Sequence, residues 1–144
     1  MEAEEPVNIV CDTKVLVSGV LFGGHAREIL RLSSRGTVIN FISPTILREA
    51  EDVLRRSKFG LRPEQVLEIV ALFKDTFEIV TPSVRVRAIL SDPGDNHVIE
   101  AALAAQAKYI ISWDKHLLEL IKWEDILLVS PAQFMQTVIS QQSA

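Results

Sequence analysis

Short apolar runs alternate along the chain with longer segments in which apolar residues recur every three or four positions. The short runs, which predict β-strands, are residues 7–11, 38–42, 77–80, 109–113 and 126–129. The longer segments have the spacing of helices that bury one face. Strands that alternate with helices form parallel sheets covered by helices on both faces. We therefore expect an α/β protein, a three-layer α/β/α sandwich with a mostly parallel, roughly five-stranded central sheet.

Residues that favour helix ends mark several boundaries between these elements. Ser43-Pro44 and Ser130-Pro131 each combine a capping serine with a proline suited to the first helical turn. Gly36 follows the helical pattern of residues 25–34, where a C-terminal glycine is expected. The segment 91–97 contains Pro, Gly, Asp and Asn and opens another helix.

The length and composition predict one domain. With 144 residues, of which 48% are apolar, the chain suits one core and is too short for two ordinary domains. We expect a single domain over residues 1–144, with its core at about residues 7–138.

The chain shows no leader pattern and no apolar stretch near the roughly 20 residues of a spanning helix. The single cysteine, Cys11, is expected to be a small buried side chain in a reducing compartment. These features predict a soluble, cytoplasmic protein with no membrane partner.

Acidic residues stand where predicted strands end and helices begin. Asp12 directly follows the first predicted strand, and Asp114 follows the fourth. The carboxyl ends of parallel strands share one edge of a sheet, where ligands bind at the point at which the strand order reverses. Asp95 begins a predicted helix three positions before the apolar residue Val98, so it is expected on the face that packs toward the sheet. These acids are candidates for one site.

The helix that begins at Ser43 offers a further acid. Glu49 and Glu51 border its apolar stripe on opposite sides, and periodicity does not choose between them. Four carboxylates in one cleft would raise each other's pKa unless a counter-charge is present. Mg²⁺ or Mn²⁺ is the simplest counter-charge, because these hard cations take oxygen ligands.

Basic residues are clustered although the whole chain has a net charge of −4, which argues weakly against a nucleic-acid-binding protein. One cluster comprises Arg48, Arg55, Arg56, Lys58 and Arg62, and another comprises Arg27, Arg31 and Arg35. Either cluster could contact phosphates beside an acidic centre, although solvated helix faces also produce such rows. The three histidines, His25, His97 and His116, lack zinc-like spacing and are expected at the surface.

Several motifs occur in an order and spacing that are specific when taken together. They are Asp12-Thr13-Lys14-Val15-Leu16-Val17-Ser18, Ile42-Ser43-Pro44 leading to Glu49, Asp92-Pro93-Gly94-Asp95-Asn96, Tyr109 to Lys115, and Val129-Ser130-Pro131. Over residues 7–138 the chain thus resembles a PIN domain (PilT N-terminus-like). It resembles in particular the branch that contains toxin components of toxin–antitoxin systems.

This resemblance implies a metal-dependent ribonuclease that cleaves single-stranded RNA, the toxin of a toxin–antitoxin pair. Matched residue by residue, the catalytic and metal-binding acids are Asp12, Glu49, Asp95 and Asp114, with Mg²⁺ or Mn²⁺ as the cofactor. Glu49 is thereby chosen over Glu51, while Asn96 remains an alternative to Asp95 as the third site position.

Other residues and partners follow from the same resemblance. Supporting positions are Thr13, Lys14, Asn96 and Ser112, and the residues expected to hold the RNA backbone are Arg48 and Arg55. The implied protein partners are an antitoxin and a second copy of the chain in a homodimer formed through helices.

Two departures from the family pattern keep an alternative open. Lys14 stands where the family usually has asparagine, and His116 where it usually has a second aspartate. The Lys14 ammonium could compete with the metal for Asp12, turn outward, or bind substrate phosphate. The alternative function is a catalytically weak PIN-like module that acts by binding RNA or a protein. A haloacid-dehalogenase-type phosphotransferase is disfavoured because it needs an acid at Lys14, and a nucleotide-binding Rossmann domain because the first turn is not glycine-rich.

Overall fold

The computed structural model describes the backbone of residues 5–86 and 93–143, and the side chains of these residues except 93–95 and 142–143. In this part of the chain, six strands form one sheet in the order β3-β2-β1-β4-β6-β5. The strands are β1 (Val7–Cys11), β2 (Val38–Ile42), β3 (Glu78–Ile79), β4 (Tyr109–Ile111), β5 (Lys122–Trp123) and β6 (Ile126–Val129). The described pairs are parallel except β5 with β6. The mostly parallel α/β sheet is therefore confirmed, with β5 as a short edge strand beyond the five expected.

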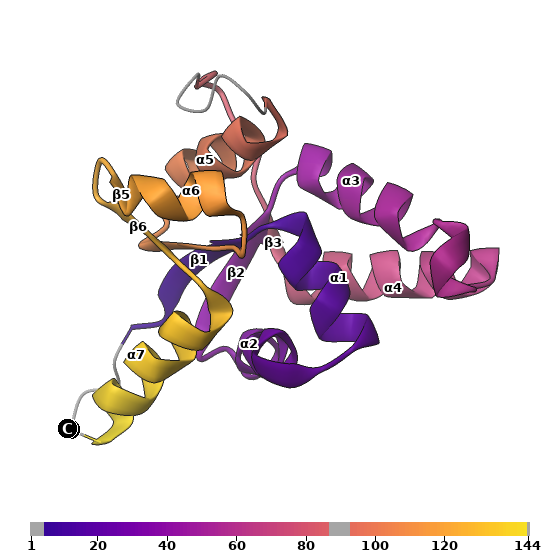
Figure 1. The fold of residues 1–144 in the computed structure, drawn as a ribbon, viewed down its shortest axis with the longest axis horizontal. Coiled ribbons are helices and arrows are strands. Elements are labelled where there is room, and N and C mark those ends of the chain that lie inside the picture. Colours follow the sequence, from indigo (N-terminus) through magenta and orange to yellow (C-terminus); the bar gives the residue numbers. More distant parts are fainter. Residues whose placement is uncertain (1–4, 87–92, 144) are drawn as a thin grey trace.

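Helices cover both faces of this sheet (Figure 1). They are α1 (Thr13–Leu21), α2 (Gly24–Arg35), α3 (Pro44–Leu54), the 3-10 helix η1 (Ser57–Phe59), α4 (Pro63–Thr76), α5 (Pro93–Ala105), α6 (Lys115–Leu120) and α7 (Pro131–Ser143). In the view of Figure 1, α5 and α6 lie above the sheet, α2 and α7 lie below it, and α3 and α4 extend to the right. Within the described ranges, no helix is long and apolar enough to cross a membrane.

The predicted helix ends are formed by the expected contacts. The Ser43 hydroxyl accepts a hydrogen bond from the Ile46 amide at 3.1 Å, so it caps α3. Gly36 ends α2 in the left-handed conformation, with φ of 78°. Ser130 and Gln133 cap α7 reciprocally, because the Ser130 amide donates to the Gln133 side chain and the Ser130 hydroxyl accepts from the Gln133 amide.

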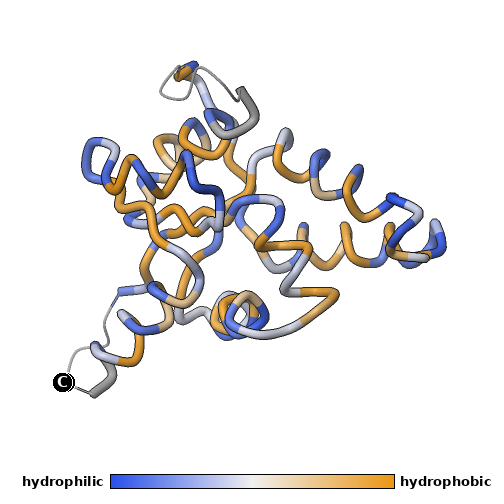
Figure 2. The backbone as a smooth tube through the Cα atoms, viewed as in Figure 1, coloured by the Kyte–Doolittle hydropathy of each residue, from blue (hydrophilic) through white to orange (hydrophobic). Residues whose placement is uncertain are grey.

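The core is built around the two central strands, β1 and β4. Ile9 and Val10 of β1, and Ile110 and Ile111 of β4, have no exposed surface. Figure 2 shows these central strands as predominantly hydrophobic, whereas the surrounding helices carry both hydrophobic and hydrophilic residues. Strands buried on both faces have little freedom to move, so residues at their carboxyl ends are held firmly.

Helices α1 and α2 approach each other closely at Gly19. A β-carbon at this position would lie 2.7 Å from Leu30 Cδ1 and 3.0 Å from the Ala26 carbonyl oxygen. The Arg27 guanidinium strengthens the same contact by donating to the carbonyls of Gly19 and Val20, each at 2.9 Å. Arg27 therefore caps the carboxyl end of α1.

The close approach predicts that Gly19→Val destabilises the protein by about 1–3 kcal/mol, because the added methyl groups must displace backbone atoms of α2. Urea unfolding followed by circular dichroism would measure the loss. Ala104→Val is the matched control, since it places the same residue on an exposed position of helix α5. Equal unfolding free energies for the two variants would show that α1 and α2 are not closely packed at Gly19.

Candidate functional site

Asp12 and Asp114 lie just beyond the carboxyl ends of neighbouring parallel strands. Asp12 follows β1, and its backbone amide donates to the Ile111 carbonyl of β4 at 2.9 Å. Strand β1 lies between β2 and β4, so the chain leaves β1 toward one side of the sheet and β4 toward the other. This is the point at which the strand order reverses, where ligands bind in sheets of this kind.

Ser112 joins the two acidic segments. Its hydroxyl donates to Asp12 Oδ2 at 2.8 Å and accepts from the Asp114 backbone amide at 2.9 Å. The Ser112 side chain is buried, with 1% of its surface exposed. One buried hydroxyl thus orients the carboxylate of Asp12 and the backbone of Asp114 together.

The Asp114 carboxylate also caps helix α6. Its Oδ1 atom accepts hydrogen bonds from the backbone amides of His116 at 2.8 Å and Leu117 at 3.3 Å. An acid at a helix amino end is stabilised by the unpaired amides and by the helix dipole. These two bonds go to Oδ1 and not to Oδ2, and the side chain is 24% exposed.

The electrostatic environment of Asp12 and Asp114 favours the binding of a cation. Burial raises the pKa of Asp12, and the charge of Asp114 raises it further, while hydrogen bonds from Ser112 and the Thr13 amide and the charge of Lys14 lower it. The net effect is a pKa above the ordinary value. A cation held between the two carboxylates would favour their charged forms.

Glu49 lies at the contact between helices α1, α3 and α5. Its Oε2 atom accepts a hydrogen bond from the Thr13 hydroxyl at 3.2 Å, and its Oε1 atom lies 3.1 Å from His97 Nδ1. Glu51 instead lies 3.7 Å from Arg55, one turn along α3. The structure therefore places Glu49, rather than Glu51, beside the residue that follows Asp12.

The contact of His97 with Glu49 is the part of this arrangement that the sequence did not predict. The His97 side chain is 40% exposed, so it lies partly at the surface, as expected, and partly against Glu49. His25 and His116 also lie near acids, at 3.9 Å from Glu28 and Asp114 respectively. The position of His97 in the first turn of α5, two residues after a candidate acid, was the only available signal.

The third predicted acid is described only in part. Asp95 belongs to the first turn of α5, as expected, but its side chain and all of Asp92 lie outside the described residues. The predicted direction of the Asp95 side chain thus stays a prediction. The neighbouring Asn96 is buried, with 6% of its surface exposed.

The donor chemistry suits a hard divalent cation. Among the described side chains, no three His, Cys, Asp or Glu residues are grouped closely enough to hold a metal. The adjacent Asp12 and Asp114 nevertheless supply carboxylate oxygens, which are the ligands that Mg²⁺ and Mn²⁺ prefer. Cys11 does not offer a competing thiolate ligand, because burial raises its pKa to about 12. The residues present therefore fit Mg²⁺ or Mn²⁺.

The predicted basic residues are exposed at the surface. Lys14 is exposed in the first turn of α1, and its charge lowers the pKa of Asp12. Arg48 is exposed on α3, and Arg55 is exposed at the C-cap of this helix and paired with Glu51. The described ion pairs join none of these three cations to Asp12, Asp114 or Glu49.

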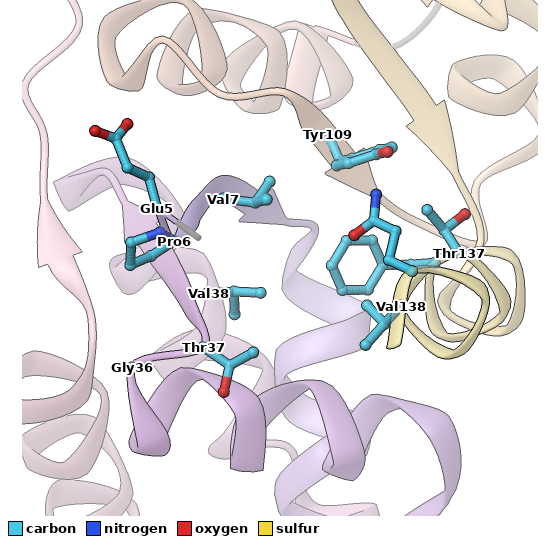
Figure 3. A pocket seen from close by; sticks show the side chains of 11 residues that line it. Glu5, Pro6, Val7, Gly36, Thr37, Val38, Tyr109, Thr137 and Val138 are labelled. Atoms are coloured by element: carbon cyan, nitrogen blue, oxygen red, sulfur yellow. The ribbon is translucent and has the colours of Figure 1, made fainter. Parts of the chain in front are cut away.

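A pocket of about 380 Å³ lies at the opposite edge of the sheet, near the amino ends of β1 and β2 (Figure 3). Its side chains include Val7, Val38, Tyr109, Phe134 and Val138. Among its described lining residues, Glu5 is the only ionisable group besides Tyr109. This pocket therefore lacks the paired carboxylates of the Asp12 edge.

The fold and the site define an α/β protein with an acidic centre at the carboxyl edge of a parallel sheet. The profile of the PIN domain family matches residues 8–116, so the chain belongs to the PIN domain family. The crystal structure of VapBC2 from Rickettsia felis bound to a DNA fragment from their promoter is similar, with a TM-score of 0.62 and 17% sequence identity. The alignment covers 85% of this chain and 97% of that chain, and it supports the fold. No curated protein matches the chain.

The raised pKa of Asp12 predicts a pH-dependent loss of stability in metal-free buffer. The folded state holds the Asp12 proton more tightly than the unfolded state does. This contribution is therefore complete below the unfolded pKa of about 3.9 and is lost as the pH rises through the folded pKa. Asp12→Asn should abolish this dependence and be more stable than the unaltered protein at neutral pH.

Urea unfolding in EDTA across this pH range would measure the difference. Asp52→Asn is the control, because Asp52 is exposed on helix α3 and the change removes a carboxylate in the same way. A constant stability difference between Asp12→Asn and the unaltered protein at every pH would contradict the prediction.

Proposed function

We propose that this PIN domain protein is a metal-dependent ribonuclease that cleaves single-stranded RNA. The observation that carries the proposal is the buried Asp12 carboxylate beside Asp114, with Ser112 holding both segments at the point where the strand order reverses. A pair of acids in this setting suits a cation that acts on a phosphodiester. Family membership supports the same chemistry, because the resemblance to PIN domains implies this activity.

In the proposed mechanism, Asp12 and Asp114 would hold Mg²⁺ or Mn²⁺, and Glu49 and Asp95 would complete the acidic centre. When bound, such a cation lowers the pKa of a water and neutralises charge on the phosphate and the leaving oxygen. Ser112 keeps the Asp12 carboxylate oriented through its hydroxyl hydrogen bond. The carboxylates act as ligands and not as nucleophiles.

Residues around the acids have positioning and binding roles in this proposal. Thr13 and His97 hold the two oxygens of Glu49 from helices α1 and α5. Arg48 on α3 and Arg55 at its C-cap are exposed, and they would contact the RNA backbone without reading its sequence. Asn96, which is buried near the start of α5, is assigned a supporting role.

We further propose that the protein is the toxin of a toxin–antitoxin pair. The similar VapBC2 structure contains a complex bound to promoter DNA, which favours a protein partner for this chain as well. Exposed apolar residues on α4, Leu67 and Leu72, are compatible with protein contacts. The antitoxin and the homodimer stay predictions.

The central prediction is that purified protein cleaves labelled single-stranded RNA with Mn²⁺ or Mg²⁺ and does not cleave it in chelator. Asp12→Asn and the double variant Asp12→Asn/Asp95→Asn should lower the rate roughly a hundredfold or more, because they remove carboxylate ligands. Gel analysis of the labelled products measures the rate.

Asp52→Asn is the matched control, an acid-to-amide change on an exposed position of α3. Cleavage that persists in chelator or in the double variant would refute the metal mechanism. Intact RNA binding with no cleavage under any metal would favour the alternative, a PIN-like binding module.

Lys14 gives a second prediction, because its positive charge acts on Asp12. Lys14→Asn should preserve or increase metal-dependent cleavage, since removal of the ammonium lessens competition with the cation. The rate should be followed against Mn²⁺ concentration, with Lys74→Asn as the control for loss of an exposed lysine on α4. A clear loss of activity in Lys14→Asn alone would show that Lys14 assists the reaction.

A further inference from the structure

An aromatic pair, exposed Phe22 and partly buried Phe59, lies at the far end of helix α1. Phe22 follows the helix and is 70% exposed, an unusual exposure for a large apolar side chain. Its ring centroid lies 6.1 Å from that of Phe59 in η1, with 54° between the ring planes. Together with Leu21 and Lys58, the two rings line a hollow of about 550 Å³. This surface offers aromatic faces to a ligand.

Positive charge is concentrated next to these rings. Lys58 Nζ lies 5.1 Å from the Phe59 ring centroid, in a cation–π contact. Exposed Arg56 precedes Lys58 by two residues, and neither residue takes part in the described ion pairs. The whole chain carries a net charge of −4, whereas Arg56 and Lys58 form a local group of positive charge. Cations beside an exposed ring such as Phe22 match the phosphates and bases of a single strand.

Helix α1 connects this surface to the acids. Asp12 immediately precedes the helix and Phe22 immediately follows it, so its nine residues separate the two by about 14 Å. The Arg27 guanidinium holds the carboxyl end of α1 through the carbonyls of Gly19 and Val20. A strand that passes the acids could thus reach a firmly held aromatic surface within a few nucleotides.

We propose that Phe22, Phe59 and Lys58 form a subsite in which a base of single-stranded RNA stacks, a few nucleotides from the bond that is cleaved. The proposal rests on the ribonuclease function and adds where the strand is held outside the acidic centre. The rings accept any base, because every base has a π-face, and Lys58 and Arg56 contact the backbone. The cations favour RNA over an apolar protein segment as the occupant.

The test is RNA binding measured by fluorescence anisotropy in EDTA, where cleavage does not interfere. Phe22→Ala should weaken the binding of a labelled single strand about fivefold or more, and Phe22→Trp should retain it. Leu67→Ala is the matched control, because it removes an apolar side chain that is 56% exposed on α4 and should leave binding unchanged. The high exposure of Phe22 makes its replacement compatible with folding, which circular dichroism checks.

A second variant tests the role of charge. Lys58→Ala should weaken binding and reduce the dependence of affinity on salt, whereas Lys74→Ala, an exposed change on α4, should do neither.

The outcomes separate the subsite from the ribonuclease function. If the unaltered protein does not cleave RNA but Phe22→Ala still weakens RNA binding, the ribonuclease function is refuted and the subsite is supported. Equal affinities for Phe22→Ala, Leu67→Ala and the unaltered protein would overturn the subsite even if the protein cleaves RNA, and would leave the hollow to a protein partner. Failure of the unaltered protein to bind RNA would overturn it as well.

Discussion

The pairing of β1 with β4 is the constraint on which the candidate site depends. Parallel register places Cys11 opposite Ile111, so the chain delivers Asp12 and Ser112 to the same edge. The Ser112 hydroxyl then accepts from the Asp114 amide and donates to the Asp12 carboxylate. Because both strands are buried, the acids cannot separate without disturbing the core. The geometry of the acids is thus inherited from the sheet and does not require an ordered loop.

The same arrangement lowers the stability of the folded protein when no cation is bound. A carboxylate that is withdrawn from water beside a second carboxylate is less stable in its charged form, and burial is the main cause of the raised Asp12 pKa. The Ser112 hydrogen bond opposes this effect only in part. Such a conflict between local electrostatics and folding is characteristic of functional sites. A cation bound beside the two carboxylates would relieve this conflict.

The sequence predicted most of the fold, because apolar runs and helix caps are local signals. Strand β5 was missed since its two residues are too few to show a period, and it pairs with β6 as a short hairpin. Glu49 and Glu51 could not be separated by periodicity, since they flank the stripe of α3 symmetrically. The family resemblance favoured Glu49, and contacts between distant segments now separate the two acids: Thr13 and His97 contact Glu49, whereas Glu51 lies beside Arg55. The His97 contact was missed for the same reason.

These contacts around Glu49 also connect the helices to the strand edge. Thr13 belongs to α1 and directly follows Asp12, while His97 belongs to the first turn of α5, next to Asn96. An ionised carboxylate only accepts hydrogen bonds, so both side chains act on Glu49 as donors when His97 carries its proton on Nδ1. A displacement of α3 would therefore also shift Thr13, the residue after Asp12, and the start of α5. Ser112 thus orders Asp12 and Asp114 beyond the ends of β1 and β4, while Thr13 and His97 position Glu49 between helices α1 and α5.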